Sequence, residues 1–282
     1  MSSAPLETPS INLEGVRIAF DEREVLRGVS FSVARGETLA LLGETGSGKT
    51  LLLKMVSGLL RPDAGRIQVL GSELTAMSEE ELLPLRRQLG FVFQEGALFD
   101  SLSVADNVAY RLREEGAGED EIDARVDESL RFVEMQDARE KLPGELSGGM
   151  RRRVSIARAL ITRPPIVLYD SPTAGLDPVT SQTIITLILR LRDEYGVTSL
   201  LATQRIQDAF ALANFRFTPQ SNTVARLSGN GKPPAGVPAG AGVAAESPRT
   251  RFLFLRQGKV YFEGDQDAVA GTQDAYLQRF LV

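Results

Sequence analysis

The sequence predicts an α/β fold that has a parallel sheet at its core, an antiparallel β subdomain and an inserted helical subdomain. Short apolar runs typical of strands alternate with segments of helical periodicity, which predicts a parallel sheet with helices on its faces. Two segments near the start of the chain alternate apolar and polar residues, as half-buried strands do. Residues 103–160 contain few strand candidates, so we expect a helical insertion there.

The predicted elements follow one another along the chain. Residues 11–18 and 25–33 are the two alternating strands, and residues 37–42 form a buried strand that ends at Gly43. Helices are predicted at 49–60, at 103–136 with a break at Gly116 and Gly118, at 150–161 and at 178–195, and further strands at 89–93, 166–170, 197–203, 251–255 and 259–263.

One segment breaks this pattern. Residues 218–249 are rich in Gly, Pro, Ala and Ser and cannot bury enough apolar surface to order themselves, which predicts a flexible insertion. A segment that binds another molecule is the alternative. Residues 215–217 resemble the start of a strand that resumes at Phe252, so we expect the insertion to interrupt the edge of a sheet.

These elements predict one domain at residues 9–265, with the helical subdomain at about residues 96–162. Residues 266–282 form a tail with apolar residues at helical spacing. We expect the tail to be a helix packed on the domain, with docking to a partner as the alternative.

Composition limits the possible functions. The chain has 282 residues, 43% of them hydrophobic, which is enough for a sizeable core. A net charge of −5 does not suggest a nucleic-acid binder, although it does not exclude a local basic patch. Cysteine is absent, which rules out disulfides. Residues 1–10 do not resemble a signal peptide and no run of about 18 apolar residues occurs, so we expect that work at a membrane requires a membrane-spanning partner.

Residues 43–50 carry the most specific motif. Gly43-Glu44-Thr45-Gly46-Ser47-Gly48-Lys49-Thr50 matches G-x-x-x-x-G-K-[ST] between a predicted strand and a predicted helix. The glycines let backbone N–H groups point at phosphate oxygens, and the helix N-terminus adds positive charge. We predict that Lys49 reaches the β- and γ-phosphates of ATP and that Thr50 ligates Mg²⁺. A glycine-rich turn without function is the alternative, which the complete match disfavours.

An acidic residue at the end of a strand complements this loop. Residues 166–170 are an apolar strand that ends in Asp170, which predicts a carboxylate beside the metal at the carboxyl edge of the sheet. An ordinary strand end is the alternative, and the loop at residues 43–50 argues against it.

A second glycine motif gives a more specific resemblance. Leu146-Ser147-Gly148-Gly149-Met150 resembles the signature motif of ABC ATPases, and the basic residues after it resemble the usual continuation. The chain is therefore similar to the ATP-binding subunits of ABC transporters, which have a P-loop NTPase fold. Physically, Ser147 and the two glycines before a helix form a second anion cradle, although the same turn can be a simple helix cap. The resemblance implies that Ser147, Gly148 and Gly149 bind the γ-phosphate held by a second ATP-binding subunit, either a copy of this chain or a paralogue.

Other residues match the family in order. Phe20 stands where an aromatic residue stacks on adenine, although a core phenylalanine is the alternative. Gln94 resembles the Q-loop glutamine, which ligates Mg²⁺ and contacts a transmembrane permease subunit. Residues 174–178 resemble the D-loop. The family implies a peripheral position on the cytoplasmic face of the inner membrane and no nucleic-acid partner.

Residues 93–114 suggest a subfamily. The stretch Gly96-Ala97-Leu98-Phe99-Asp100-Ser101-Leu102, followed by Asn107-Val108, resembles the ATPases of Mla/Ttg2-type systems. That resemblance implies transport of phospholipids or other hydrophobic molecules, together with a permease and an MCE-domain protein.

Two positions depart from the family. Ser171 follows Asp170 where most members have a glutamate that polarises the attacking water, and a serine hydroxyl is a poor proton acceptor. General-base catalysis contributes roughly 10²–10⁴-fold, so we expect slow hydrolysis. Gln204 stands where the family has a histidine that contacts the γ-phosphate, and the chain contains no histidine.

Three explanations of these substitutions remain open: a homodimer with slow turnover, a degenerate subunit paired with a competent paralogue, and deliberate substitution. An ATP-dependent clamp that regulates a permease without hydrolysis is a further alternative. A soluble ABC protein of the repair or translation type is disfavoured because the chain has one ATPase unit and no long coiled coil. The signature motif disfavours a kinase-type P-loop enzyme.

Overall fold

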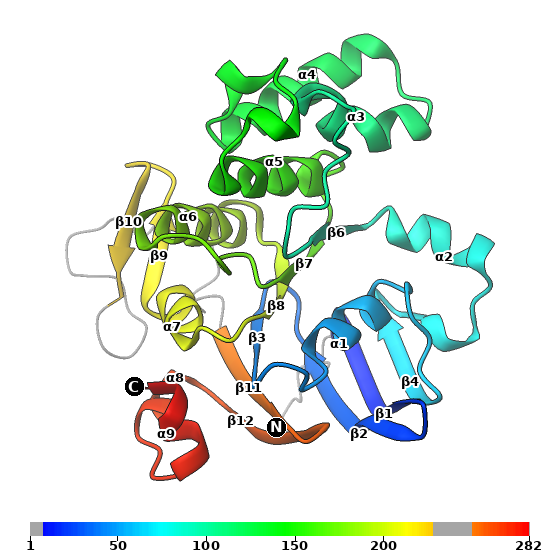
Figure 1. Ribbon diagram of the computed structural model, residues 1–282, viewed down its shortest axis with the longest axis vertical. Coiled ribbons are helices and arrows are strands. Elements are labelled where there is room, and N and C mark those ends of the chain that lie inside the picture. Colours follow the sequence, from blue (N-terminus) through cyan, green and yellow to red (C-terminus); the bar gives the residue numbers. More distant parts are fainter. Residues whose placement is uncertain (1–7, 228–249, 282) are drawn as a thin grey trace, which may run out of the picture.

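The computed structural model describes residues 8–227 and 250–281. A six-stranded sheet forms the centre of the domain (Figure 1), with the strand order β12-β11-β3-β8-β7-β6. Five of its strands run parallel and only β12 is antiparallel to its neighbour β11. The predicted α/β fold with a parallel core is therefore confirmed. The bounds of the strands are β3 Thr38–Leu42, β6 Leu89–Val92, β7 Ile166–Asp170, β8 Thr198–Ala202, β11 Thr250–Arg256 and β12 Lys259–Gly264.

The central strands β3, β7 and β8 are buried along their whole length. Both faces of the sheet are covered, which explains why these strands read as continuous apolar runs in the sequence. Because β7 and β3 run in the same direction, their carboxyl ends lie on one edge of the sheet, and Gly43 and Asp170 lie on that edge.

A second sheet is antiparallel and has the order β2-β1-β4-β5. Its first two strands were predicted from their alternation. The last two were not, because Gly65 and Gly71 flank a segment with only two buried apolar residues, Ile67 and Val69. The buried faces of both sheets share one core cluster with α1. The strands are β1 Ile11–Phe20, β2 Arg23–Val33, β4 Ala64–Val69 and β5 Ser72–Glu73.

Three helices, α3, α4 and α5, lie together at the top of Figure 1, and Gly116 and Gly118 separate α3 from α4 as predicted. The helix after the phosphate loop, α1, is shorter than predicted because the chain turns at Gly58. Two helices, α2 and α7, were not predicted. The helices before β9 are α1 Lys49–Val56, α2 Glu79–Arg86, α3 Val104–Glu114, α4 Glu119–Phe132, α5 Gly148–Leu160, α6 Pro178–Tyr195 and α7 Ile206–Asn214.

The prediction that residues 215–217 begin the strand resumed at Phe252 is wrong. Strand β9 (Phe215–Thr218) pairs with β10 (Thr223–Arg226) in a separate two-stranded sheet. Side chains of α6 hold this hairpin: Arg192 donates to the carbonyl of Phe215 (2.9 Å), and Asp193 accepts from the N–H of Phe217 (2.7 Å). The first part of the predicted insertion, residues 218–227, is therefore a turn and a strand, and residues 228–249 lie outside the described residues.

The tail contains two short helices, α8 (Gln266–Ala270) and α9 (Ala275–Leu281), where one was expected. The chain turns between them, and Asp274 caps α9 by accepting from the N–H groups of Tyr276 and Leu277. Val269, Tyr276 and Leu277 are buried against β11. In the part of the chain that the structure describes, every helix is too short or too polar to cross a membrane.

Candidate functional site

The phosphate loop connects β3 to α1, and its glycines adopt a backbone that other residues avoid. Gly43 has φ 145° and Gly48 has φ 102°. Space is also limiting: a Cβ on Gly43 would lie 2.5 Å from the carbonyl oxygen of Leu255, and one on Gly48 would lie 2.4 Å from Leu26 Cδ2. These two glycines are therefore required both by conformation and by packing.

Lys49 lies across the mouth of this loop. Its ammonium group donates to the carbonyls of Gly43 (2.8 Å) and Glu44 (2.9 Å) and to Ser47 Oγ (3.3 Å). Burial lowers the pKa of Lys49 to about 8, and the negative charge of Asp170 partly opposes this shift. The loop thus concentrates a buried cation at the start of a helix, which is the chemistry that an anion such as a phosphate needs.

A hydroxyl and a carboxylate meet next to Lys49. Thr50 Oγ1 donates to Asp170 Oδ1 (3.2 Å), and Ser171 Oγ donates to the same oxygen (3.3 Å). Oxygen ligands of this kind suit Mg²⁺, which keeps several waters and takes few protein ligands. Among residues 8–227 and 250–281, no three His, Cys, Asp or Glu side chains are grouped to hold a metal ion. The donor set therefore fits a magnesium ion whose other ligands come from phosphate and water.

Gln94, the third predicted magnesium ligand, is exposed. It follows β6 by two residues, and β6 pairs with β7 so that Val92 is level with Tyr169. Gln94 and Asp170 therefore leave adjacent strands at the same edge of the sheet. No hydrogen bond within the described chain joins Gln94 to Thr50 or Asp170 in this state.

The two substituted positions both lie at this edge. Ser171 has φ 49°, and its N–H donates to the carbonyl of Ala202 (2.8 Å). Gln204 Oε1 accepts from Thr45 Oγ1 in the phosphate loop (3.2 Å). The chain therefore places serine and glutamine beside the loop, and neither provides a general base of ordinary strength.

A polar network behind Ser171 was missed by sequence reasoning. Buried Asp208 accepts hydrogen bonds from Thr203 Oγ1 (3.2 Å) and from Thr173 Oγ1, and burial raises its pKa. Arg205 donates to Ser181 Oγ (3.0 Å), which ties the segment after β8 to the start of α6. The sequence signal is a single acidic residue in the mostly apolar helix α7.

The second glycine motif begins α5. Ser147 Oγ accepts from the N–H of Met150 (3.2 Å), so in this structure the serine is a helix cap. A Cβ on Gly149 would lie 2.3 Å from Thr180 Cγ2, which makes the glycine a packing requirement. Within the described residues no hydrogen bond joins this motif to the phosphate loop.

Two arginines of α5 hold the segment around Gln94, and the sequence did not single them out. Arg152 is buried and donates to the carbonyl of Phe93 (2.7 Å). Arg158 donates to the carbonyls of Gly96 (2.9 Å) and Ala97 (2.7 Å). Burial lowers the pKa of Arg152, and the charges of Asp170 and Glu95 oppose that shift, so both carboxylates lie near it. The arginines at residues 151–153 and 158 can be seen in the sequence, but the sequence does not show which of their side chains are buried in the fold.

Phe20 ends β1 and is 46% exposed. It belongs to none of the buried clusters of the described chain, so a core role is excluded. An exposed aromatic ring is free to stack on a planar ligand.

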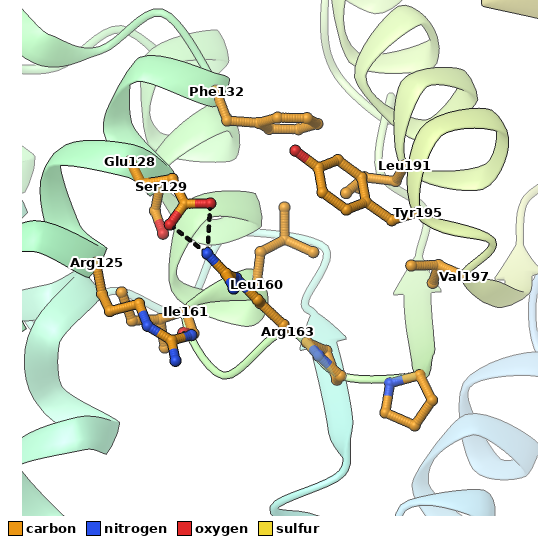
Figure 2. A pocket seen from close by; sticks show the side chains of 12 residues that line it. Arg125, Glu128, Ser129, Phe132, Leu160, Ile161, Arg163, Leu191, Tyr195 and Val197 are labelled. Carbon is orange, nitrogen blue, oxygen red and sulfur yellow. Dashed lines mark hydrogen bonds and ion pairs between the residues drawn. The ribbon is translucent and has the colours of Figure 1, made fainter. Parts of the chain in front are cut away.

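An apolar cavity of about 280 Å³ lies elsewhere, between α4, α5 and α6. Figure 2 shows Phe132 and Tyr195 on one side and Arg163 paired with Glu128 through both carboxylate oxygens (2.8 and 2.7 Å). Pro165 and Val197, which precede β7 and β8, also line it. The cavity is thus at the amino-terminal edge of the sheet, opposite the edge where ligands of α/β sheets bind.

The sequence model of the family described as ABC transporter matches residues 26–174. The methionine import ATP-binding protein MetN of Brucella abortus is 40% identical over 198 residues, which is 70% of this chain and 54% of that protein. The MetN of Bifidobacterium longum is 40% identical over 254 residues, 90% of this chain and 54% of that protein. The chain therefore spans about half the length of these curated relatives.

Solved structures agree with the fold. A cassette from Clostridium perfringens, part of the ABC transporter complex cbiONQ, superposes with a TM-score of 0.75 at 26% identity and covers 98% of this chain and 96% of that one. A dimeric ATP-binding cassette in a post-hydrolysis state, bound to ADP and Pi, gives a TM-score of 0.72 at 27% identity and covers 90% and 98%.

Proposed function

The chain belongs to the ABC transporter family, and from this premise we propose that it is the ATP-binding subunit of an ABC transporter. The observation that carries the proposal is the geometry of Lys49, a buried cation held across the loop of residues 43–50 beside the hydroxyl–carboxylate pair of Thr50 and Asp170. We assign the ATP-binding domain to residues 9–265, with its helical subdomain at about 96–162 and the tail at 266–282.

In this proposal the backbone N–H groups of residues 43–50 and the ammonium of Lys49 bind the β- and γ-phosphates. Thr50, Asp170 and Gln94 hold Mg²⁺, which supplies neutralisation of phosphate charge when it is bound. Phe20 stacks on adenine. The motif Ser147-Gly148-Gly149 contributes to the site of a second subunit: it forms the N-terminus of α5, where backbone N–H groups favour an anion, and within the described residues no hydrogen bond joins it to the chain's own loop.

Hydrolysis is proposed to be slow. The attacking water needs a proton acceptor next to the γ-phosphate, and Ser171 offers only a hydroxyl that already donates to Asp170. Gln204 can orient a phosphate oxygen by donating from its amide but cannot take up a proton. A homodimer with slow turnover is the first form of the proposal. A degenerate subunit that completes the site of a paralogue, or a clamp that closes on ATP without hydrolysis, is the second.

A transmembrane permease is the proposed partner, docked at a groove of about 360 Å³ that is lined by residues on both sides of Gln94 in the sequence. Stacked rings line it, Phe91 on Phe93 (4.1 Å between centroids) and Phe99 beside Tyr110 (4.6 Å). Arg158 joins them with its guanidinium 6.0 Å from the Phe99 ring. The exposed rings of Phe99 and Tyr110, beside the partly buried Arg158, suit a partner that presents an amphipathic segment. The chain would then lie peripherally on the cytoplasmic face of the inner membrane.

Two cargo classes follow from different observations. Residues 93–114 resemble Mla/Ttg2-type ATPases and contribute Phe93, Ala97, Phe99, Tyr110 and Arg111 to this groove, which favours phospholipids or other hydrophobic molecules and a complex with an MCE-domain protein. The curated relatives are named methionine import proteins, which favours methionine. Reconstitution with each type of permease discriminates between them, because only the matching permease would stimulate ATP hydrolysis by this chain.

The central proposal is tested by nucleotide binding. Wild-type chain with Mg²⁺ is expected to bind ATP, measured by isothermal titration calorimetry, and Lys49→Ala is expected to weaken binding at least ~10-fold because it removes the buried cation. Lys54→Ala, at an exposed position on the same helix, is the matched control. A wild-type chain that does not bind ATP, or equal binding by Lys49→Ala, would overturn the proposal.

A further inference from the structure

The tail helix α9 is linked to the phosphate loop through the backbone carbonyl of Leu255 in β11. Tyr276 donates from its hydroxyl to the carbonyl of Leu255 (3.3 Å). The same carbonyl oxygen lies so close to Gly43 that a Cβ there would be 2.5 Å from it. One atom at the end of β11 therefore touches both the first residue of the loop and the tail.

Aromatic packing fixes the position of α9 further. The rings of Phe280 and Phe254 meet edge to face at 5.3 Å, and Tyr276 meets Phe280 at 5.4 Å. The guanidinium of Arg256 lies 4.3 Å from the Tyr276 ring. Contacts of this kind favour one orientation of the helix over others.

This placement brings a cation to the loop. Arg279 Nη1 lies 3.4 Å from Glu44 Oε1, and both side chains are mostly exposed, at 70% and 55%. Both residues line a cavity of about 430 Å³, and Thr45 and Gln204 also line it. Arg279 therefore shares a cavity with the glutamine that stands where the family has its phosphate-contacting histidine.

The cavity lies at the γ-phosphate end of the loop. Lys49, which reaches toward the β- and γ-phosphates in loops of this type, donates to the carbonyls of Gly43 and Glu44, and both of these residues line the cavity. A γ-phosphate at this end would add negative charge to the cavity that ADP does not bring. An exposed ion pair is weak, so the guanidinium can leave Glu44 for a stronger phosphate contact at little cost.

We propose that Arg279 is a γ-phosphate-sensing residue of the ATP site, delivered by the tail helix, that exchanges its contact with Glu44 for the γ-phosphate when ATP binds. The inference rests on the proposed function and goes beyond it by assigning a cation from outside residues 43–50 to discrimination between ATP and ADP. It also gives the tail a role in the site that Gln204 leaves without an imidazole.

The test measures the affinities of the full chain for ATP and for ADP, both with Mg²⁺, by isothermal titration calorimetry. Arg279→Ala is expected to weaken ATP binding by about fivefold to tenfold and to leave ADP binding within about twofold, because an exposed charged contact of modest strength is lost. Arg279→Lys retains the charge and is expected to recover most of the ATP affinity. Gln278→Ala, an exposed change on the same helix, is the matched control and is expected to match wild type for both nucleotides.

A further variant tests the exchange of partners. Glu44→Gln removes the carboxylate that competes for Arg279, so this variant should bind ATP severalfold more tightly than wild type. The double variant Glu44→Gln with Arg279→Ala should bind ATP no more tightly than Arg279→Ala alone. Equal losses of ATP and ADP affinity in Arg279→Ala would indicate a merely structural role and overturn the inference, as would unchanged ATP affinity. Failure of wild type to bind ATP would instead sink the proposed function, so the two failures are distinct.

Discussion

Thr50 Oγ1 donates to Asp170 Oδ1 across 3.2 Å, which joins the first turn of α1 to the end of β7. The same carboxylate oxygen accepts from Ser171 Oγ. The proposed metal-binding residue and the position of the family's catalytic glutamate are therefore adjacent in the chain, at Asp170 and Ser171. Asp170 Oδ1 already accepts hydrogen bonds from two hydroxyls, so the Asp170 carboxylate is a poor substitute for the missing general base.

Restoring a carboxylate at position 171 should raise turnover. Ser171→Glu is expected to increase the rate of ATP hydrolysis by about 100-fold or more, since a general base contributes roughly 10²–10⁴-fold. The measurement is phosphate release at saturating ATP and Mg²⁺. Ser171→Gln has the same length without the basicity and should stay near wild type. If glutamate and glutamine gave equal rates, loss of the base would not be the limiting defect.

The pKa of Lys49 predicts a pH dependence of ATP affinity. Burial lowers that pKa to about 8 in the free protein, and the charge of bound ATP must raise it, so above pH 8 binding requires uptake of a proton. ATP affinity should therefore be nearly constant below pH 8 and fall above it, by up to about tenfold per pH unit. Calorimetric titrations between pH 7 and 9.5 measure this. Lys49→Arg stays protonated and should show a flat profile, and an equal decline in that variant would assign the titration to another group.

The lowered pKa of Lys49 affects the free energy of unfolding in the opposite direction to its effect on ATP affinity. An unfolded lysine keeps its proton to about pH 10.5, so between pH 8 and 10.5 the unfolded chain binds more protons than the native one. This group therefore makes the free energy of unfolding rise with pH in that window, while ATP affinity falls.

The two glycines of the signature motif should differ in their response to alanine. A Cβ on Gly149 meets Thr180 Cγ2 at 2.3 Å, whereas the nearest atom to one on Gly148 is Leu176 Cδ2 at an ordinary 3.7 Å. Gly149→Ala is expected to lower the free energy of unfolding by about 1–3 kcal/mol through overpacking. Gly148→Ala should be neutral or slightly stabilising, because alanine favours the helix. Chemical denaturation of both variants checks this, and equal stabilities would refute the packing argument.

The elements that could be predicted from the sequence are those whose local residue pattern directly reflects their burial in the fold. Strands β3 and β7 are fully buried, so their apolar runs and the motifs at their carboxyl ends were readable without the structure. The meeting of Thr50 with Asp170 followed from the rule that parallel strands present their carboxyl ends on one edge.

The remaining features depend on contacts between distant segments. The β9–β10 hairpin is held by hydrogen bonds with Arg192 and Asp193 on α6, and these contacts cannot be inferred from the sequence of residues 218–227. The inward turn of Arg152 depends on the carbonyl of Phe93, 59 residues away in the chain. The approach of Arg279 to Glu44 depends on how the tail packs, which periodicity alone does not specify.

The pairing of β6 with β7 has a mechanical consequence. Val92 is paired with Tyr169, so residues 93 and 170 leave neighbouring strands that lie about 4.8 Å apart. Strand β7 is buried and hydrogen-bonded on both sides, and hydrogen bonds from Arg152 and Arg158 tie residues 93–97 to α5. A partner that displaces residues 93–97 would therefore pass that displacement to β6 and, across a single strand pairing, to the end of β7 beside the phosphate loop.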